Sequence, residues 1–152
     1  MNFKKPISAL VIIHTLDLQV LLLERAAHPG MWQSVTGSQE TDEPLAETAR
    51  REVEEETGIV APLDQFIPWR IINRFEIYPQ WRNRYANGIT HNLEHVFSLC
   101  VPIPATPRLA PNEHSSYQWL PWQTAATKCF SWTNQDAILM LPDRAKNKGA
   151  GM

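Results

Sequence analysis

Four glutamates stand within five positions of the segment 51–58, which reads REVEEETG. On a helix, Glu52, Glu55 and Glu56 occupy positions i, i+3 and i+4, where like charges repel by about 0.2–0.5 kcal/mol per pair. A cation shared by these carboxylates offsets that repulsion. Mg²⁺ takes oxygen ligands and keeps positions open for water and phosphate, and no His or Cys cluster favours zinc. The spacing therefore predicts a magnesium site, with a solvated run of charge as the alternative.

One helix must position these acids, and the sequence predicts it between residues 44 and 58. Thr41–Glu43 offers a cap, Pro44 suits the first turn, and Gly58 ends the helix. Between them an apolar residue recurs every four positions, which predicts one buried stripe. The stripe consists of Leu45, Ala49 and Val53.

The acids of this helix divide into two groups. Glu52 and Glu56 continue the line of the apolar stripe, where an uncompensated negative charge is expensive. Glu47 and Glu54 point elsewhere, where the i,i+4 pairs Glu47–Arg51 and Arg50–Glu54 are expected.

The rest of the chain predicts one mixed α/β domain over residues 1–152. Apolar runs predict strands at 7–15, 20–25, 31–39 and 94–103, whereas the segment 59–92 is mixed, with short strand-like pieces such as RFEIY (74–78) interrupted by prolines. The segment 117–122 introduces a short helix. A last helix is expected over 134–141 with Thr133 as its cap, and the polar tail from about residue 143 is expected to fray.

Composition narrows the class of protein. A formal net charge of −2 disfavours a nucleic-acid partner held by bulk charge. No run approaches the roughly 20 apolar residues that span a membrane. Two cysteines, Cys100 and Cys129, without a metal or redox motif are typical of reduced thiols in a cytoplasmic protein.

The segment 37–59, GSQETDEPLAETARREVEEETGI, resembles the signature of the Nudix family, Gx5Ex7REUxEExGU with U aliphatic, at every specified position. The resemblance implies an α/β (α+β) fold, an α/β/α sandwich around a mixed β-sheet. It also implies hydrolysis of a diphosphate linked to another group, with Mg²⁺ or Mn²⁺ required.

The same resemblance assigns roles by position. It implies metal binding by Glu52, Glu55 and Glu56, and it implies that Gly37 lets its loop approach the helix. Arg51 and Glu43 form the pair that holds the signature segment in shape. The general base stays open between Glu52, Glu56 and an acid outside the signature. Glu113, on a predicted loop, is the outside candidate for metal binding or for the base, with a surface carboxylate as the alternative.

The flanking segments resemble a bacterial subgroup of this family, whose substrates are pterin or purine triphosphates. The resemblance is carried by residues 4–13, 22–38, 75–90 and 130–138. It implies hydrolysis of dihydroneopterin triphosphate to the monophosphate and pyrophosphate in folate biosynthesis. The alternatives are pyrophosphohydrolysis of (d)NTPs with a preference for dATP, or a non-catalytic module that binds nucleotides; the latter is disfavoured because every glutamate of the signature is present.

Candidate substrate contacts lie outside the signature. Lys4 and Arg25 are expected to bind phosphate, and aromatic side chains of the 75–90 segment are expected to stack on a flat ring. Within 70–95, four arginines against two glutamates leave a surplus of two positive charges. His91, His95 and His114 are interpreted as surface or structural groups. The full set of predicted substrate contacts is Lys4, Arg25, Thr36, Phe75, Glu76, Ile77, Tyr78 and Ser131, with Trp81 and Tyr85 as further stacking candidates.

Overall fold

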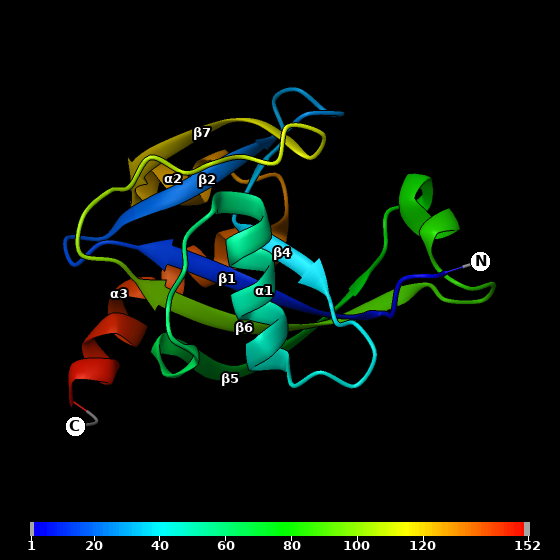
Figure 1. Cartoon of the computed structure of the whole chain (residues 1–152), viewed down its shortest axis with the longest axis horizontal. Helices are drawn as coiled ribbons and strands as arrows, with labels where there is room; N and C mark the ends of the chain where they lie inside the picture. Colours follow the sequence, from blue (N-terminus) through cyan, green and yellow to red (C-terminus); the bar gives the residue numbers. More distant parts are fainter. Residues whose placement is uncertain (1, 151–152) are drawn as a thin grey trace.

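The computed structural model describes the backbone of residues 2–150 and the side chains of residues 2–145. In this part of the chain, a seven-stranded mixed sheet forms the centre of the molecule (Figure 1). The path runs β3-β2-β1-β6-β5, with β4 paired to β1 and β7 paired to β2. Strands β1 and β6 are parallel, and the other paired strands are antiparallel. The strands are β1 (Ile7–His14), β2 (Gln19–Arg25), β3 (Trp32–Gln33), β4 (Val35–Ser38), β5 (Phe66–Glu76), β6 (His91–Cys100) and β7 (His114–Pro121).

Helices cover both faces of the sheet, as Figure 1 shows with α1 on one side and α2 and α3 on the other. Side chains alternate along β1 because successive residues of a strand point to opposite faces. Val11 and Ile13 pack in the core beneath α1, whereas Leu10 and Ile12 pack against α2 and α3. The predicted three-layer sandwich is therefore confirmed. The helices are α1 (Leu45–Thr57), α2 (Trp122–Lys128) and α3 (Trp132–Ala150), with short 3-10 turns η1 (Leu63–Gln65) and η2 (Pro79–Arg84).

Helix α1 has the predicted buried stripe, and it ends at Gly58 as predicted. Ala49 and Val53 are fully buried. Gly58 adopts φ 76° and donates its N–H to the carbonyl of Glu54, a left-handed cap that favours glycine. The predicted cap at Thr41–Glu43 is wrong: Pro44 is the N-cap residue and no side chain caps the helix.

Two strand predictions need correction. The run 31–39 forms two short strands, β3 on β2 and β4 on β1, with Ser34 between them. The mixed segment 59–92 contains the 11-residue strand β5. Its pairing with β6 shifts between Pro68 and Ile72. A proline is tolerated there because β5 is an edge strand, where a missing N–H donor costs no ladder bond.

The segment 117–122 is strand as far as Pro121, and α2 begins at Trp122. The last helix begins at Trp132, so Thr133 lies inside it and is not the cap. The helix also continues to Ala150, through residues expected to fray, and residues 151–152 lie outside the described part. Arg144 anchors this extension, because it donates to the Trp69 carbonyl at 2.9 Å. None of the described helices has the length and hydropathy needed to cross a bilayer.

Candidate active site

A pocket of about 1080 Å³ gathers residues from both ends of the chain. It is lined by the C-terminal part of α1, by β4, by the 75–85 segment and by the loops before β7 and α3. Every predicted site residue except Glu43 lines this pocket. These residues are Lys4, Arg25, Thr36, Arg51, Glu52, Glu55, Glu56, Phe75, Glu76, Ile77, Tyr78, Glu113 and Ser131.

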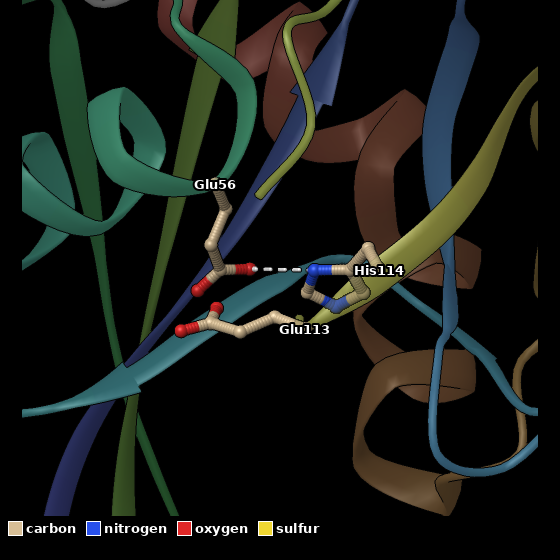
Figure 2. Close-up of side chains that lie close together, drawn as sticks. All are labelled: Glu56, Glu113 and His114. Atoms are coloured by element: carbon tan, nitrogen blue, oxygen red, sulfur yellow. Dashed lines mark ion pairs between the residues drawn. The ribbon is translucent and has the colours of Figure 1, made fainter. Parts of the chain in front are cut away.

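Carboxylates converge at one end of the pocket. Figure 2 shows Glu56 from the last turn of α1 facing Glu113 and His114 at the start of β7. One ligand atom from each of these three residues lies within 4.8 Å of the others. Glu52 and Glu55 line the pocket beside them, with side chains 14% and 56% exposed.

These acids are electrostatically crowded. Burial raises the pKa of Glu56 well above its ordinary value, and the charges of Glu52 and Glu113 raise it further. Burial also raises the pKa of Glu52. Among the described residues, the Oε1 atom of Glu56 is buried and has no hydrogen-bond partner. Negative charge is thus concentrated at this end of the pocket.

His114 is the residue of this cluster that the sequence did not single out. Its side chain is 4% exposed, so of the two interpretations, surface group or structural group, burial excludes the first. Burial lowers its pKa to about 4, with a contribution from Arg25, and the ring is therefore neutral at pH 7. Only its position next to Glu113 in the chain could have indicated it.

Arg51 holds the signature segment together. Its guanidinium donates to Glu43 at 2.6 Å, to Glu52 at 2.7 Å and to the Ser38 carbonyl at 3.1 Å. Glu43 also accepts from Thr48 Oγ1 at 2.8 Å. The Arg51 guanidinium lowers the pKa of Glu43 to about 2. Because these bonds occupy Arg51, the expected Glu47–Arg51 pair does not form.

One ion pair on the solvent face of α1 differs from the prediction. Glu47 pairs with Arg50 at i,i+3. Arg50 also pairs with Glu54 at 3.0 Å, as the i,i+4 spacing predicts. Two acid groups on one helix are thus confirmed: one paired in solvent, the other facing the pocket.

Gly37 allows the loop to approach the helix. A Cβ atom added at this position would lie 1.6 Å from Oε2 and 2.1 Å from Cδ of Glu52. A Cβ atom fits there only if the Glu52 carboxyl group moves, so glycine at position 37 lets β4 pass the helix with Glu52 in its observed place.

Cations lie close to the acids. Lys4 and Arg25 both line the pocket, together with Arg84. Desolvation in the pocket lowers the pKa of Lys4, as does the charge of Arg84. Of the four arginines counted in the 70–95 segment, Arg84 alone lines the pocket. Arg82 instead pairs with Glu76 at 2.6 Å, which occupies one predicted substrate contact.

An aromatic wall lines part of the pocket and consists of Tyr78, Trp81 and Phe130. The rings of Tyr78 and Trp81 stack with centroids 5.2 Å apart and an angle of 22°. Phe130 meets Trp81 edge-on at 6.1 Å, and the Arg25 guanidinium lies 4.6 Å from the Trp81 ring centroid. Such faces suit a flat heterocycle.

Three other predicted contacts have local structural roles. Thr36 lies in β4 opposite Leu10. Ile77 is buried and donates its N–H to Thr90. Ser131 stands just before α3, and its carbonyl accepts from the Gln135 N–H.

The acid cluster fits a divalent cation. Glu56 and Glu113 each bring a carboxylate oxygen to the three-residue cluster, and Glu52 and Glu55 add carboxylates along the same wall. The oxygen-rich donor set suits a hard cation, since carboxylates are the ligands such ions prefer.

Comparison with known proteins places this site in a family. The NUDIX domain model matches residues 4–141, and the chain therefore belongs to the Nudix family. It is 40% identical to the dihydroneopterin triphosphate diphosphatase of Escherichia coli K12 over 139 residues, which cover 90% of this chain and 91% of that protein. The protein of the same name from Haemophilus influenzae is 38% identical over 141 residues, covering 91% and 88%.

Solved structures agree with this assignment. The structure of the E. coli dihydroneopterin triphosphate pyrophosphohydrolase superimposes with a TM-score of 0.83 at 40% identity, over 91% of this chain and 95% of that one. The predicted Nudix fold and enzyme class are thus confirmed. Family members are hydrolases that use a divalent metal, and the acid cluster described above fits that requirement.

Proposed function

We propose that this protein hydrolyses dihydroneopterin triphosphate to dihydroneopterin monophosphate and pyrophosphate, with Mg²⁺ as its cation. One observation carries the proposal: a single pocket joins the signature carboxylates to the aromatic wall. A pterin triphosphate has the matching shape, because its flat ring and its anhydride lie at opposite ends. The 40% identity to enzymes of that name over 90% of the chain supports the choice of ring.

The carboxylate end of the pocket serves the anhydride. Glu52, Glu55, Glu56 and Glu113 would hold Mg²⁺, which when bound polarises the phosphate and makes a coordinated water more acidic. Arg51 keeps Glu52 in place through the 2.7 Å bond, and Glu43 keeps Arg51 in place through the 2.6 Å bond.

Lys4 and Arg25 neutralise the phosphoryl oxygens. Phosphoryl transfer spreads negative charge over those oxygens, so fixed cations nearby lower the barrier. Desolvation of both side chains strengthens this attraction, because charges interact more strongly in a low dielectric. A carboxylate must also take a proton from the attacking water. Glu52, Glu56 and Glu113 are the carboxylates that line this part of the pocket and can serve.

The aromatic wall holds the ring. Tyr78, Trp81 and Phe130 are half-buried and line the pocket. Arg25, held over Trp81, sits between the ring end and the phosphate end. The wall therefore sets the distance from a bound ring to the reacting phosphate.

Purine triphosphates are the second candidate, since adenine also presents a flat ring to the same wall. Steady-state release of pyrophosphate from dihydroneopterin triphosphate and from dATP, measured side by side with Mg²⁺, separates them. The proposal predicts a higher kcat/KM for the pterin. A preference for dATP of about tenfold, or roughly 1.4 kcal/mol of transition-state binding, would contradict it.

The proposal includes a cytoplasmic location. Cys100 and Cys129 are free thiols, and thiols of this kind persist in a reducing compartment. Rapid lysis in denaturant, followed by labelling with a thiol reagent, tests this. Both cysteines should react without prior addition of a reducing agent.

A further inference from the structure

A row of buried polar side chains leads from the aromatic wall to Glu56. Arg25 stands over Trp81, Gln33 follows on β3, and His114 comes next at the start of β7. Gln33 and His114 are 5% and 4% exposed. Polar groups buried to this degree normally serve a hydrogen-bonding purpose, because leaving them unpaired is expensive.

The direction of each hydrogen bond in this row follows from donor chemistry. A guanidinium only donates, so the Gln33 atom that meets Arg25 Nη1 at 3.2 Å must be the carbonyl oxygen. The amide nitrogen of Gln33 then faces His114 Nε2 at 3.3 Å and donates to it. A ring nitrogen that accepts a hydrogen bond carries no proton. A histidine ring carries at least one proton, and in His114 that proton is therefore on Nδ1.

His114 Nδ1 points at Glu56. It lies 3.9 Å from Oε1 of Glu56, as Figure 2 shows with a dashed line. Both atoms are buried, and neither has a hydrogen-bond partner in the part of the chain that the structure describes. A bridging water does not fit between atoms this close, since two hydrogen bonds in series need more length than this. A shift of the carboxylate by about 1 Å brings the pair to the roughly 2.8 Å of an N–H···O⁻ bond.

We propose that His114 is a positioning residue that donates its Nδ1 proton to Oε1 of Glu56, with Gln33 and Arg25 fixing the tautomer. The bond commits one oxygen of Glu56 to the protein interior and leaves the other for the pocket. A neutral donor does this without adding positive charge, so the carboxylate keeps its attraction for a cation. A lysine or arginine at the same place would compete with that cation.

The competing role for His114 is direct metal ligation, since its ring lies within 4.8 Å of carboxylate oxygens of Glu56 and Glu113. The two roles demand opposite states of Nδ1. A positioning His114 carries a proton on Nδ1, whereas a ligand that faces the acids must present a bare Nδ1.

Nitrogen-15 NMR of the histidine rings in the full-length protein reads this state directly. Two-bond ¹H–¹⁵N correlations distinguish a protonated ring nitrogen from a bare one, and the His114 signals are assigned by their loss in His114→Asn. The expected result at pH 7 is a protonated Nδ1 and a bare Nε2, both without metal and after saturation with Mg²⁺. A protonated Nε2, a doubly protonated ring, or loss of the Nδ1 proton on addition of Mg²⁺ would overturn the proposal.

Turnover supplies the second measurement. Asn at position 114 places an amide nitrogen where Nδ1 was, whereas Leu places no donor there. His114→Leu should lower kcat by about 10- to 100-fold, the worth of one hydrogen bond to a charged group, and leave KM nearly unchanged. His114→Asn should recover most of that loss. Equal losses in the two variants, or none in either, would contradict the role.

His14→Asn is the matched control. His14 is also buried, at 5% exposure, but it is the last residue of β1 and does not line the pocket. Its substitution should change stability and leave kcat unaltered. The predicted loss of kcat rests on the proposed function, whereas the predicted tautomer of His114 does not. If the protein proves inactive but Nδ1 of His114 is protonated, the proposed reaction is refuted and the positioning role of His114 is not.

Discussion

Replacing Glu43 by Gln tests the electrostatic frame around the signature segment. Glu43 accepts hydrogen bonds from Arg51 Nη2 at 2.6 Å and from the Glu40 N–H at 2.9 Å, and its side chain is 15% exposed. A pKa of about 2 in place of 4.5 corresponds to about 3 kcal/mol of folded-state stability at neutral pH. Partial exposure to solvent reduces this to about 2 kcal/mol.

The sign of the effect defines the assay. Because the folded-state pKa of Glu43 is lowered, its stabilisation is complete above about pH 5 and is lost as the pH falls from 4.5 toward 2. Urea unfolding should therefore show Glu43→Gln about 2 kcal/mol less stable than wild type at pH 7, with a smaller difference at pH 3.5.

Glu54→Gln is the control for this measurement. Glu54 also pairs with an arginine on α1, but its side chain is 47% exposed. An exposed pair contributes little, so this variant should lose less than about 0.5 kcal/mol at pH 7. If Glu43→Gln is as stable as wild type at pH 7, or if its deficit does not shrink in acid, the reasoning is refuted.

Three further predictions concern the pocket. Gly37→Ala should abolish most activity while far-UV circular dichroism stays unchanged, because the new Cβ displaces the Glu52 carboxylate; a fully active variant would rule out the close approach. Glu56→Gln should raise the Tm of the metal-free protein more at pH 8 than at pH 5, since a carboxyl with a raised pKa destabilises the fold as the pH rises above 4.5. With saturating Mg²⁺ at pH 8, the wild-type protein should instead have the higher Tm. A Tm difference that does not depend on pH would count against this. Trp81→Ala should raise KM for the triphosphate by about 10-fold, the worth of one stacked ring, with a smaller change in kcat; an unaltered KM would remove Trp81 from the binding surface.

Local spacing explains what the sequence predicted well. The stripe on α1, the end of that helix at Gly58 and the two groups of acids depend on residues within a few turns of one another. The signature segment is also contiguous, so its resemblance to the family identified the carboxylates before any tertiary contact was known. The continuous apolar run at 7–15 similarly predicted a buried strand, and β1 is buried along almost its whole length.

Long-range contacts explain the remainder. Arg51 binds Glu43, which lies just before α1 and eight positions earlier in the chain, and this decides that Glu47 pairs with Arg50. The helix rule alone could not choose between those partners. His114 is buried only because β7 pairs with β2, which brings it beside Gln33.

The aromatic wall illustrates the same limit. Phe130 lies close to Trp81 although about fifty positions separate them in the sequence. The 75–90 segment indicated stacking side chains, but the contribution of Phe130 depends on how the start of α3 packs against the sheet. Strand β5 was predicted only as short pieces for a different reason: its proline is acceptable only at a sheet edge, and edge position is a property of the whole sheet.

Phosphorus-31 NMR of a reaction with dihydroneopterin triphosphate and Mg²⁺ tests the central claim most directly. Wild-type protein should produce pyrophosphate and the pterin monophosphate, and Glu56→Gln should produce neither at a detectable rate. Release of inorganic phosphate with a pterin diphosphate, or undiminished turnover by Glu56→Gln, would contradict the account of the pocket as a metal-dependent pyrophosphohydrolase site.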